Sequence, residues 1–115
     1  MDQTWAERRS EPRYKASQVI KLTVMGEGGF TAPALIADVS LHGMGIKLHR
    51  PLQTGAEVKI SLGDAVFIGR VCHCRPNEDG FTVGLRLEQA LTKLGESTNL
   101  DRKLFEILRN FLVQA

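Results

Sequence analysis

Short runs of alternating apolar and polar residues, each ended by a turn signal, most constrain the fold of this chain. Side chains alternate across a β-strand with a period of two, so each run predicts a strand with one buried and one solvated face. Gly, Pro, Asn and Asp between the runs predict turns. Six such strands predict a mainly β protein, an antiparallel barrel or sandwich. The runs lie within residues 20–24, 31–40, 44–48, 58–62, 65–75 and 81–87.

Two of these strands carry local detail. Strict alternation in residues 31–40 puts Ile36, Asp38 and Ser40 on one face and the odd-numbered residues on the other. Gly63-Asp64 predicts a tight hairpin before the long strand 65–75. A glycine inside a strand often marks a bend, so we expect one at Gly69.

The two ends of the chain differ from its centre. Residues 1–18 lack a sustained apolar period and contain Pro12, which predicts a flexible N-terminal arm before a barrel domain at 19–115. A linker is expected at 88–99, and Asn99 or Thr98 can cap a helix at 100–113 that packs against the barrel mouth. Helical spacing is shown by Leu100, Leu104, Leu108, Phe111 and Leu112.

The composition narrows the class of protein. The 115 residues are 43% hydrophobic and 24% charged, which is ordinary for one globular domain. A net charge of +2 does not indicate a nucleic-acid binder. The sequence has neither an apolar run long enough for a transmembrane helix nor a secretory signal, so we expect a cytoplasmic protein.

Two short motifs carry binding chemistry. Arg9-Ser-Glu-Pro-Arg13 places two guanidinium groups four residues apart, and each can grip a phosphate or a guanine edge with two hydrogen bonds. Asp38-Val-Ser40-Leu-His-Gly43 places a carboxylate and a hydroxyl on one strand face. The carboxylate can accept hydrogen bonds from guanine, and the glycine allows a sharp turn or a close ligand approach. Together the motifs indicate a site for a phosphate-bearing guanine ligand.

The two motifs resemble the RxxxR and [DN]xSxxG signatures of the PilZ domain family. Further similarity is found in Gly69-Arg-Val71 and Val83-Gly-Leu-Arg-Leu87, so the resemblance covers roughly residues 7–87. It implies a six-stranded antiparallel β-barrel of the PilZ-like split-barrel type with a C-terminal α-helix. It also implies a receptor for the bacterial second messenger cyclic di-GMP.

The resemblance assigns ligand contacts residue by residue. An arginine directly before RxxxR favours an intercalated cyclic di-GMP dimer in the family, so Arg8 predicts two ligand molecules per site. Arg70, Arg75 and Arg86 alternate with apolar residues, and any of them can line the ligand surface. The expected ligand-binding residues are Arg8, Arg9, Arg13, Asp38, Ser40 and Gly43.

The expected function is a signalling receptor or adaptor without catalysis. Ligand binding would order the N-terminal arm over the barrel and alter a surface that an effector protein reads. The expected protein is a monomer or weak dimer that uses no cofactor other than its ligand and binds no DNA or RNA. Two alternatives remain: an interaction module independent of nucleotide, and a barrel that binds single-stranded nucleic acid. The seven aromatic residues are few for the second alternative.

Cys72-His73-Cys74 is the one segment that suggests a metal. In a regular strand the histidine points away from both cysteines, which leaves two ligands on one face against the four that tetrahedral zinc needs. We therefore expect no metal, with both thiols facing the core as small apolar groups.

Overall fold

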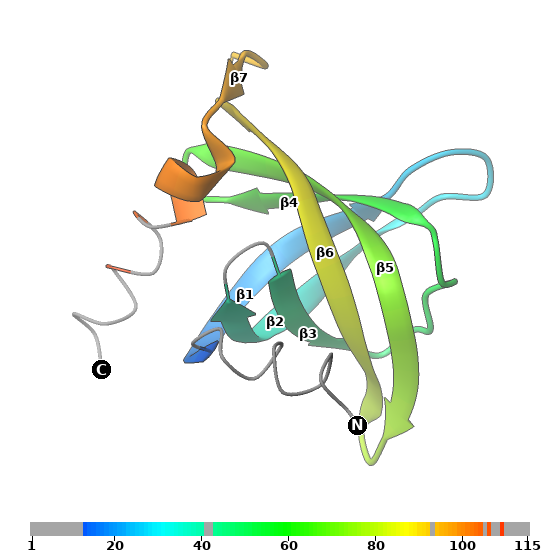
Figure 1. Ribbon diagram of the computed structural model, residues 1–115. Coiled ribbons are helices and arrows are strands. Elements are labelled where there is room, and N and C mark those ends of the chain that lie inside the picture. The colour runs from blue at the N-terminus through cyan, green and yellow to red at the C-terminus, as the bar shows by residue number, and fades with distance from the viewer. Residues whose placement is uncertain (1–12, 41–42, 93, 105, 107–108, 110–115) are drawn as a thin grey trace, which may run out of the picture.

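The computed structural model describes residues 13–40, 43–92, 94–104, 106 and 109, and their side chains from Gln18 onward. The strands follow one another closely along the chain, and the longest, β5 and β6, have 13 residues each (Figure 1). They are β1 (Arg13–Val24), β2 (Thr31–Ser40), β3 (Gly43–Leu48), β4 (Glu57–Leu62), β5 (Ala65–Asn77), β6 (Gly80–Thr92) and the short β7 (Ser97–Thr98).

The strands form one antiparallel sheet that closes on itself. Its order is β3-β2-β1-β4-β5-β6-β7, and an additional pairing of β3 with β6 joins the two sides into a six-stranded barrel. Closure removes the unpaired edges that an open sheet would expose. The expected mainly β fold, a six-stranded antiparallel barrel with a C-terminal helix, is confirmed.

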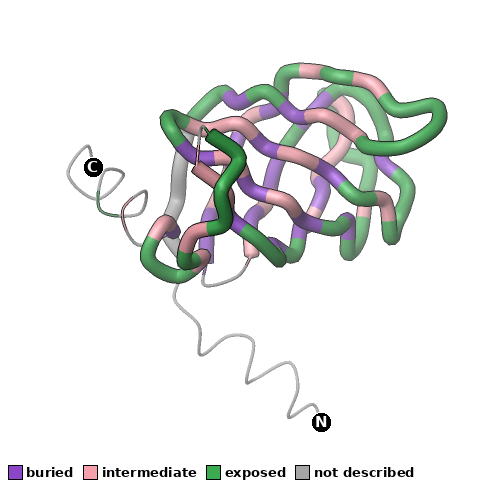
Figure 2. The backbone as a smooth tube through the Cα atoms, turned by 90° about the horizontal axis from the view of Figure 1, so that it is seen from above, coloured by how far each residue is buried: buried purple, intermediate pink, exposed green. Residues whose placement is uncertain are grey.

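The barrel interior is filled by one set of alternating side chains. Buried and more exposed positions alternate along the strands in Figure 2, as the period-two pattern predicts. Each of the six barrel strands contributes at least one apolar side chain with no exposed surface. These include Leu22, Ile36, Ile46, Ile60, Phe67 and Val83. The interior is therefore a packed core, and polar chemistry is restricted to the outer face.

The first strand begins earlier than the sequence predicts. Residues 1–18 were expected to form an arm, yet β1 starts at Arg13 and pairs with β2 through Arg13↔Ser40, Tyr14↔Val39 and Lys15↔Asp38. Pairing with the neighbouring strand specifies the conformation of this segment, and the segment's own sequence carries no apolar alternation that would predict it. The register shifts between Lys15 and Gln18, which also interrupts the periodicity.

The expected linker at 88–99 is also largely wrong. Strand β6 continues to Thr92, and β7 pairs with it through Ala90↔Thr98 and Leu91↔Ser97. The extension was missed because the register shift between Ile68 and Gly69 of β5 places Glu88 of β6 outside the regular pairing. Before this irregularity the odd-numbered residues of β6, such as Leu87, face the core. After it an even-numbered residue, the fully buried Ala90, faces the core.

A helix follows β7, and its described residues are 100–104, 106 and 109. Asn99 caps it as predicted, because its side-chain oxygen accepts a 2.8 Å hydrogen bond from the backbone N–H of Arg102. Leu104 has no exposed surface and joins the barrel core. Lys103 lies 3.9 Å from Asp64 in the β4–β5 turn, which places the helix beside that end of the barrel. The last three residues of the predicted stripe, Leu108, Phe111 and Leu112, lie outside the described residues.

The Cys72-His73-Cys74 segment departs from regular alternation. The pairing of β5 with β6 shifts between Val71 and His73, so Cys72 is the extra residue of a β-bulge. Cys72 is exposed and Cys74 is half-buried. The expectation that both thiols face the core is therefore wrong for Cys72, because one inserted residue rotates the rest of the strand by one position.

In the part of the chain that the structure describes, no helix is both long enough and apolar enough to span a membrane. Within the same residues, no group of three or more His, Cys, Asp or Glu side chains is arranged to hold a metal ion.

Candidate functional site

The second motif lies where β2 ends, and a β-bulge determines which way it faces. Ile36 pairs with Ile46 but Asp38 pairs with Gly45, so Ala37 is an extra residue in β2. Ile36 is fully buried before the bulge, and Val39 is fully buried after it. The bulge thus exchanges the two faces of the strand. Asp38 and Ser40 point outward, and the expectation that they share a face with Ile36 is wrong.

The outward face beside this motif has almost no side chains of its own. Gly43 and Gly45 of β3 alternate with the buried Met44, and Gly84 of β6 lies between the buried Val83 and Leu85. Gly45 and Gly84 are register partners across the β3–β6 pairing. We call Gly43, Gly45 and Gly84 the glycine floor. It has no side chains of its own, so neighbouring side chains or a ligand can approach its backbone closely.

The motif side chains lean over this floor. A Cβ atom on Gly45 would lie 2.8 Å from Oδ1 of Asp38, closer than a real Cβ atom approaches. A Cβ atom on Gly43 would lie 3.0 Å from Oγ of Ser40. Each glycine therefore makes room for one polar group of the motif. Ser40 is only 8% exposed.

The opposite side of the floor is lined by β5 and β6. The imidazole of His73 lies over Gly84 and occupies the space that a side chain there would need. Gly43 pairs with Arg86, and Arg86 pairs in turn with Arg70. Nη1 of Arg70 donates a 3.1 Å hydrogen bond to the carbonyl of Gly55, and its Nε lies 3.6 Å from Glu88. A carboxylate and a hydroxyl thus approach the floor from β2, and an imidazole approaches it from β5.

The first motif is described only in part. Arg13 opens β1 as the register partner of Ser40, so the backbone brings the end of RxxxR beside the end of β2. The side chain of Arg13 and all of Arg8 and Arg9 lie outside the described residues. Strand pairing therefore connects the two motifs, which stand twenty-five residues apart in the sequence.

Sequence reasoning missed part of this face. The sequence does not indicate Gly45, Gly84 or His73 as site residues. It also does not show which of Arg70, Arg75 and Arg86 contacts the ligand. Two glycines at outward positions of one short strand were an available signal, because glycine inside a strand often marks a close backbone approach. The contribution of β5 and β6 had no such signal, because it depends on barrel closure.

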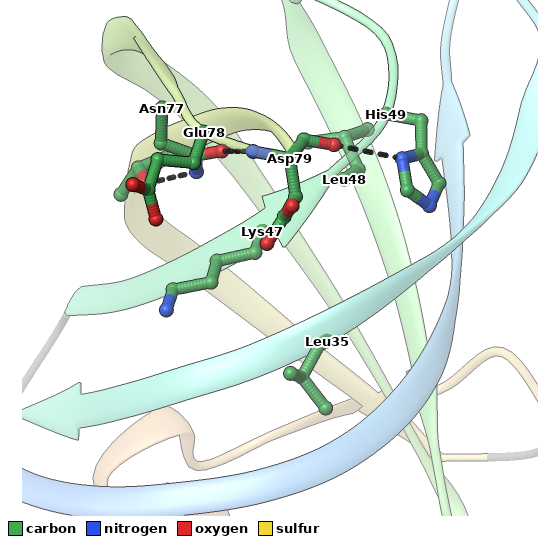
Figure 3. A pocket seen from close by; sticks show the side chains of 8 residues that line it. Leu35, Lys47, Leu48, His49, Asn77, Glu78 and Asp79 are labelled. Atoms are coloured by element: carbon green, nitrogen blue, oxygen red, sulfur yellow. Dashed lines mark hydrogen bonds between the residues drawn. The ribbon is translucent and has the colours of Figure 1, made fainter.

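A hollow of about 370 Å³ lies farther along the same strands, beside the β5–β6 turn (Figure 3). Its wall includes Leu35, Lys47 and Thr82, and its rim is held by Nδ1 of His49, 3.0 Å from the carbonyl oxygen of Asp79. None of the motif residues whose side chains the structure describes lines it. The polar groups suited to a guanine ligand converge instead on the glycine floor.

A closed β-barrel with polar groups gathered around a bare outer face is suited to binding a ligand on its surface. The family model of the PilZ domain matches residues 7–106, so the chain belongs to the PilZ family. PilZ is a non-catalytic family of ligand-binding domains, and membership in it implies a module that binds cyclic di-GMP. No match to the chain was found among curated proteins.

Proposed function

We propose that this protein is a cyclic di-GMP receptor whose ligand lies over the glycine floor. The observation that carries the proposal is the placement of Asp38 and Ser40, which a β-bulge turns outward beside two glycines. A carboxylate and a hydroxyl directed onto bare backbone do not stabilise the core, but they suit a flat polar ligand. The family match to residues 7–106 supports the same ligand class.

The proposed roles follow from side-chain chemistry. Asp38 accepts hydrogen bonds from N1–H and the exocyclic amine of guanine, which only a carboxylate or similar acceptor can do. Ser40 adds a hydroxyl that donates or accepts, and Gly43 permits close approach of the ligand. Arg9 and Arg13 grip the phosphates or the major-groove edge of guanine. Arg8, directly before the motif, favours a second, intercalated ligand molecule.

Isothermal titration with cyclic di-GMP tests this assignment. We expect binding with two ligand molecules per protein, and a loss of about tenfold to a hundredfold in affinity for Arg13→Ala, since hydrogen bonds to charged groups contribute about 1.5–3 kcal/mol. GTP is the control ligand and should not compete. No heat from wild-type protein at high ligand concentration would exclude the function. A fitted ratio of one ligand per protein would exclude only the dimer.

The proposed output is a change in the surface that an effector protein reads. Arg13 already lies in β1, so we propose that the ligand-dependent rearrangement involves the residues before it. Cyclic di-GMP would draw Arg8 and Arg9 over the floor and so reshape that surface. Amide hydrogen exchange should show ligand-dependent protection in residues 6–12 and little change in β4. Equal exchange in residues 6–12 with and without ligand would contradict this mechanism.

A further inference from the structure

We propose that Arg86 is a further ligand-binding residue, which holds the cyclic dinucleotide from the side of the glycine floor opposite Asp38 and Ser40. This inference rests on the proposed function and deepens it. The group that Arg86 recognises bears hydrogen-bond acceptors, either a phosphate or the O6 and N7 edge of guanine.

Strand register places Arg86 directly across the floor from the motif. Ser40 of β2 pairs with Gly43 of β3, and Gly43 pairs with Arg86 of β6. Neighbouring strands are about 4.8 Å apart, so the backbones of Ser40 and Arg86 are separated by about 10 Å. Gly43 lies between them and presents no side chain. A ligand resting on Gly43 therefore has the Ser40 hydroxyl on one side and Arg86 on the other.

The guanidinium of Arg86 is available for such a contact. Arg86 is exposed, and among the residues that the structure describes it has no hydrogen-bond or ion-pair partner. Arg70 is different, because the carbonyl of Gly55 and the carboxylate of Glu88 already engage it. Arg75 pairs with Thr82, four residues along β6 from Arg86 and therefore about 13 Å away. The structure thus distinguishes three arginines that the sequence leaves equivalent.

The pairing of Arg86 with Arg70 also indicates an anionic ligand. These two residues are direct cross-strand partners, and like charges in such positions are unfavourable for the sheet. Glu88 offsets one of the two charges, since it lies 3.6 Å from Nε of Arg70. The positive charge of Arg86 has no such ion pair among the residues that the structure describes. A bound phosphate would offset it.

The test is titration of four proteins with cyclic di-GMP: wild type, Arg86→Ala, Arg86→Lys and Arg75→Ala. Arg86→Ala should bind about tenfold to a hundredfold more weakly, as expected for loss of charge-assisted hydrogen bonds. Arg75→Ala removes the same charge from the same sheet and should bind within about twofold of wild type. The thermal midpoint of Arg86→Ala should not fall, because the substitution removes a repulsive pair.

The remaining outcomes separate the hypotheses. Retained affinity in Arg86→Lys identifies a phosphate, for which a point charge suffices, and lost affinity identifies the guanine edge, which needs the planar fork. If Arg86→Ala binds like Arg75→Ala while Arg13→Ala loses binding, the inference is wrong and the proposed function stands. If wild-type protein does not bind, both fail together.

Discussion

Replacing Phe67 with alanine should destabilise the barrel by about 3–5 kcal/mol, the range for truncating a buried aromatic side chain. Phe67 has no exposed surface and is the largest fully buried side chain among the described residues. It lies in β5, opposite Ile60 of β4 and Ala90 of β6, so its ring fills the interior where three strands meet. Because small domains are stable by only about 5–15 kcal/mol, this is a large fraction of the total.

Urea denaturation measures the effect, and Phe30→Ala is its matched control. Phe30 is only partly buried and packs at the edge of the core beneath the guanidinium of Arg50, 3.4 Å from the ring centroid. Its truncation should cost about 1 kcal/mol, because it removes a cation–π contact and part of a half-exposed ring. A smaller loss of stability in Phe67→Ala than in Phe30→Ala would contradict the described core.

Replacing Gly45 with valine should lower the affinity for cyclic di-GMP by about a hundredfold or more, close to 2.7 kcal/mol. Even the first side-chain atom would lie 2.8 Å from Oδ1 and 3.2 Å from Cγ of Asp38, so the carboxylate must move. The two methyl groups would also cover the backbone on which we propose the ligand lies. Valine is favourable in strands, and the group displaced is the end of a flexible side chain, so the barrel should still fold.

Lys47→Val is the control for this substitution. Lys47 is the next outward position of β3 and is exposed, so valine there tests the effect of an added β-branched residue without touching Asp38. Its affinity should match wild type, and both variants should give the wild-type circular dichroism spectrum. Wild-type affinity in folded Gly45→Val would show that the ligand does not use the glycine floor.

The two substitutions act on opposite faces of one closed sheet. Phe67 belongs to the inward set of side chains that holds six strands together, whereas Gly45 belongs to the glycine floor on the outer face. The proposed binding on the outer face would leave the core complete without ligand. It also explains why substitutions at the site should change affinity with little effect on stability.

Much of the fold could be predicted from the sequence alone. Period-two alternation with Gly, Pro, Asn and Asp turns depends on local geometry, which each segment carries in its own residues. The six strands, the Gly63-Asp64 hairpin and the Asn99 cap were predicted for that reason. The two motifs led to the PilZ family in the same way, because their spacing is local.

The tertiary structure decided the orientation and extent of the site. An extra residue at Ala37 is invisible to alternation, because only the register against β3 shows that Asp38 and Ser40 face outward while Ile36 faces the core. The strand character of residues 13–18 likewise comes from pairing with β2. Arg86 and Gly84 reach the motif only because β3 pairs with β6 and closes the barrel. These features depend on hydrogen bonds between strands that are distant in sequence, so no local sequence pattern predicts them.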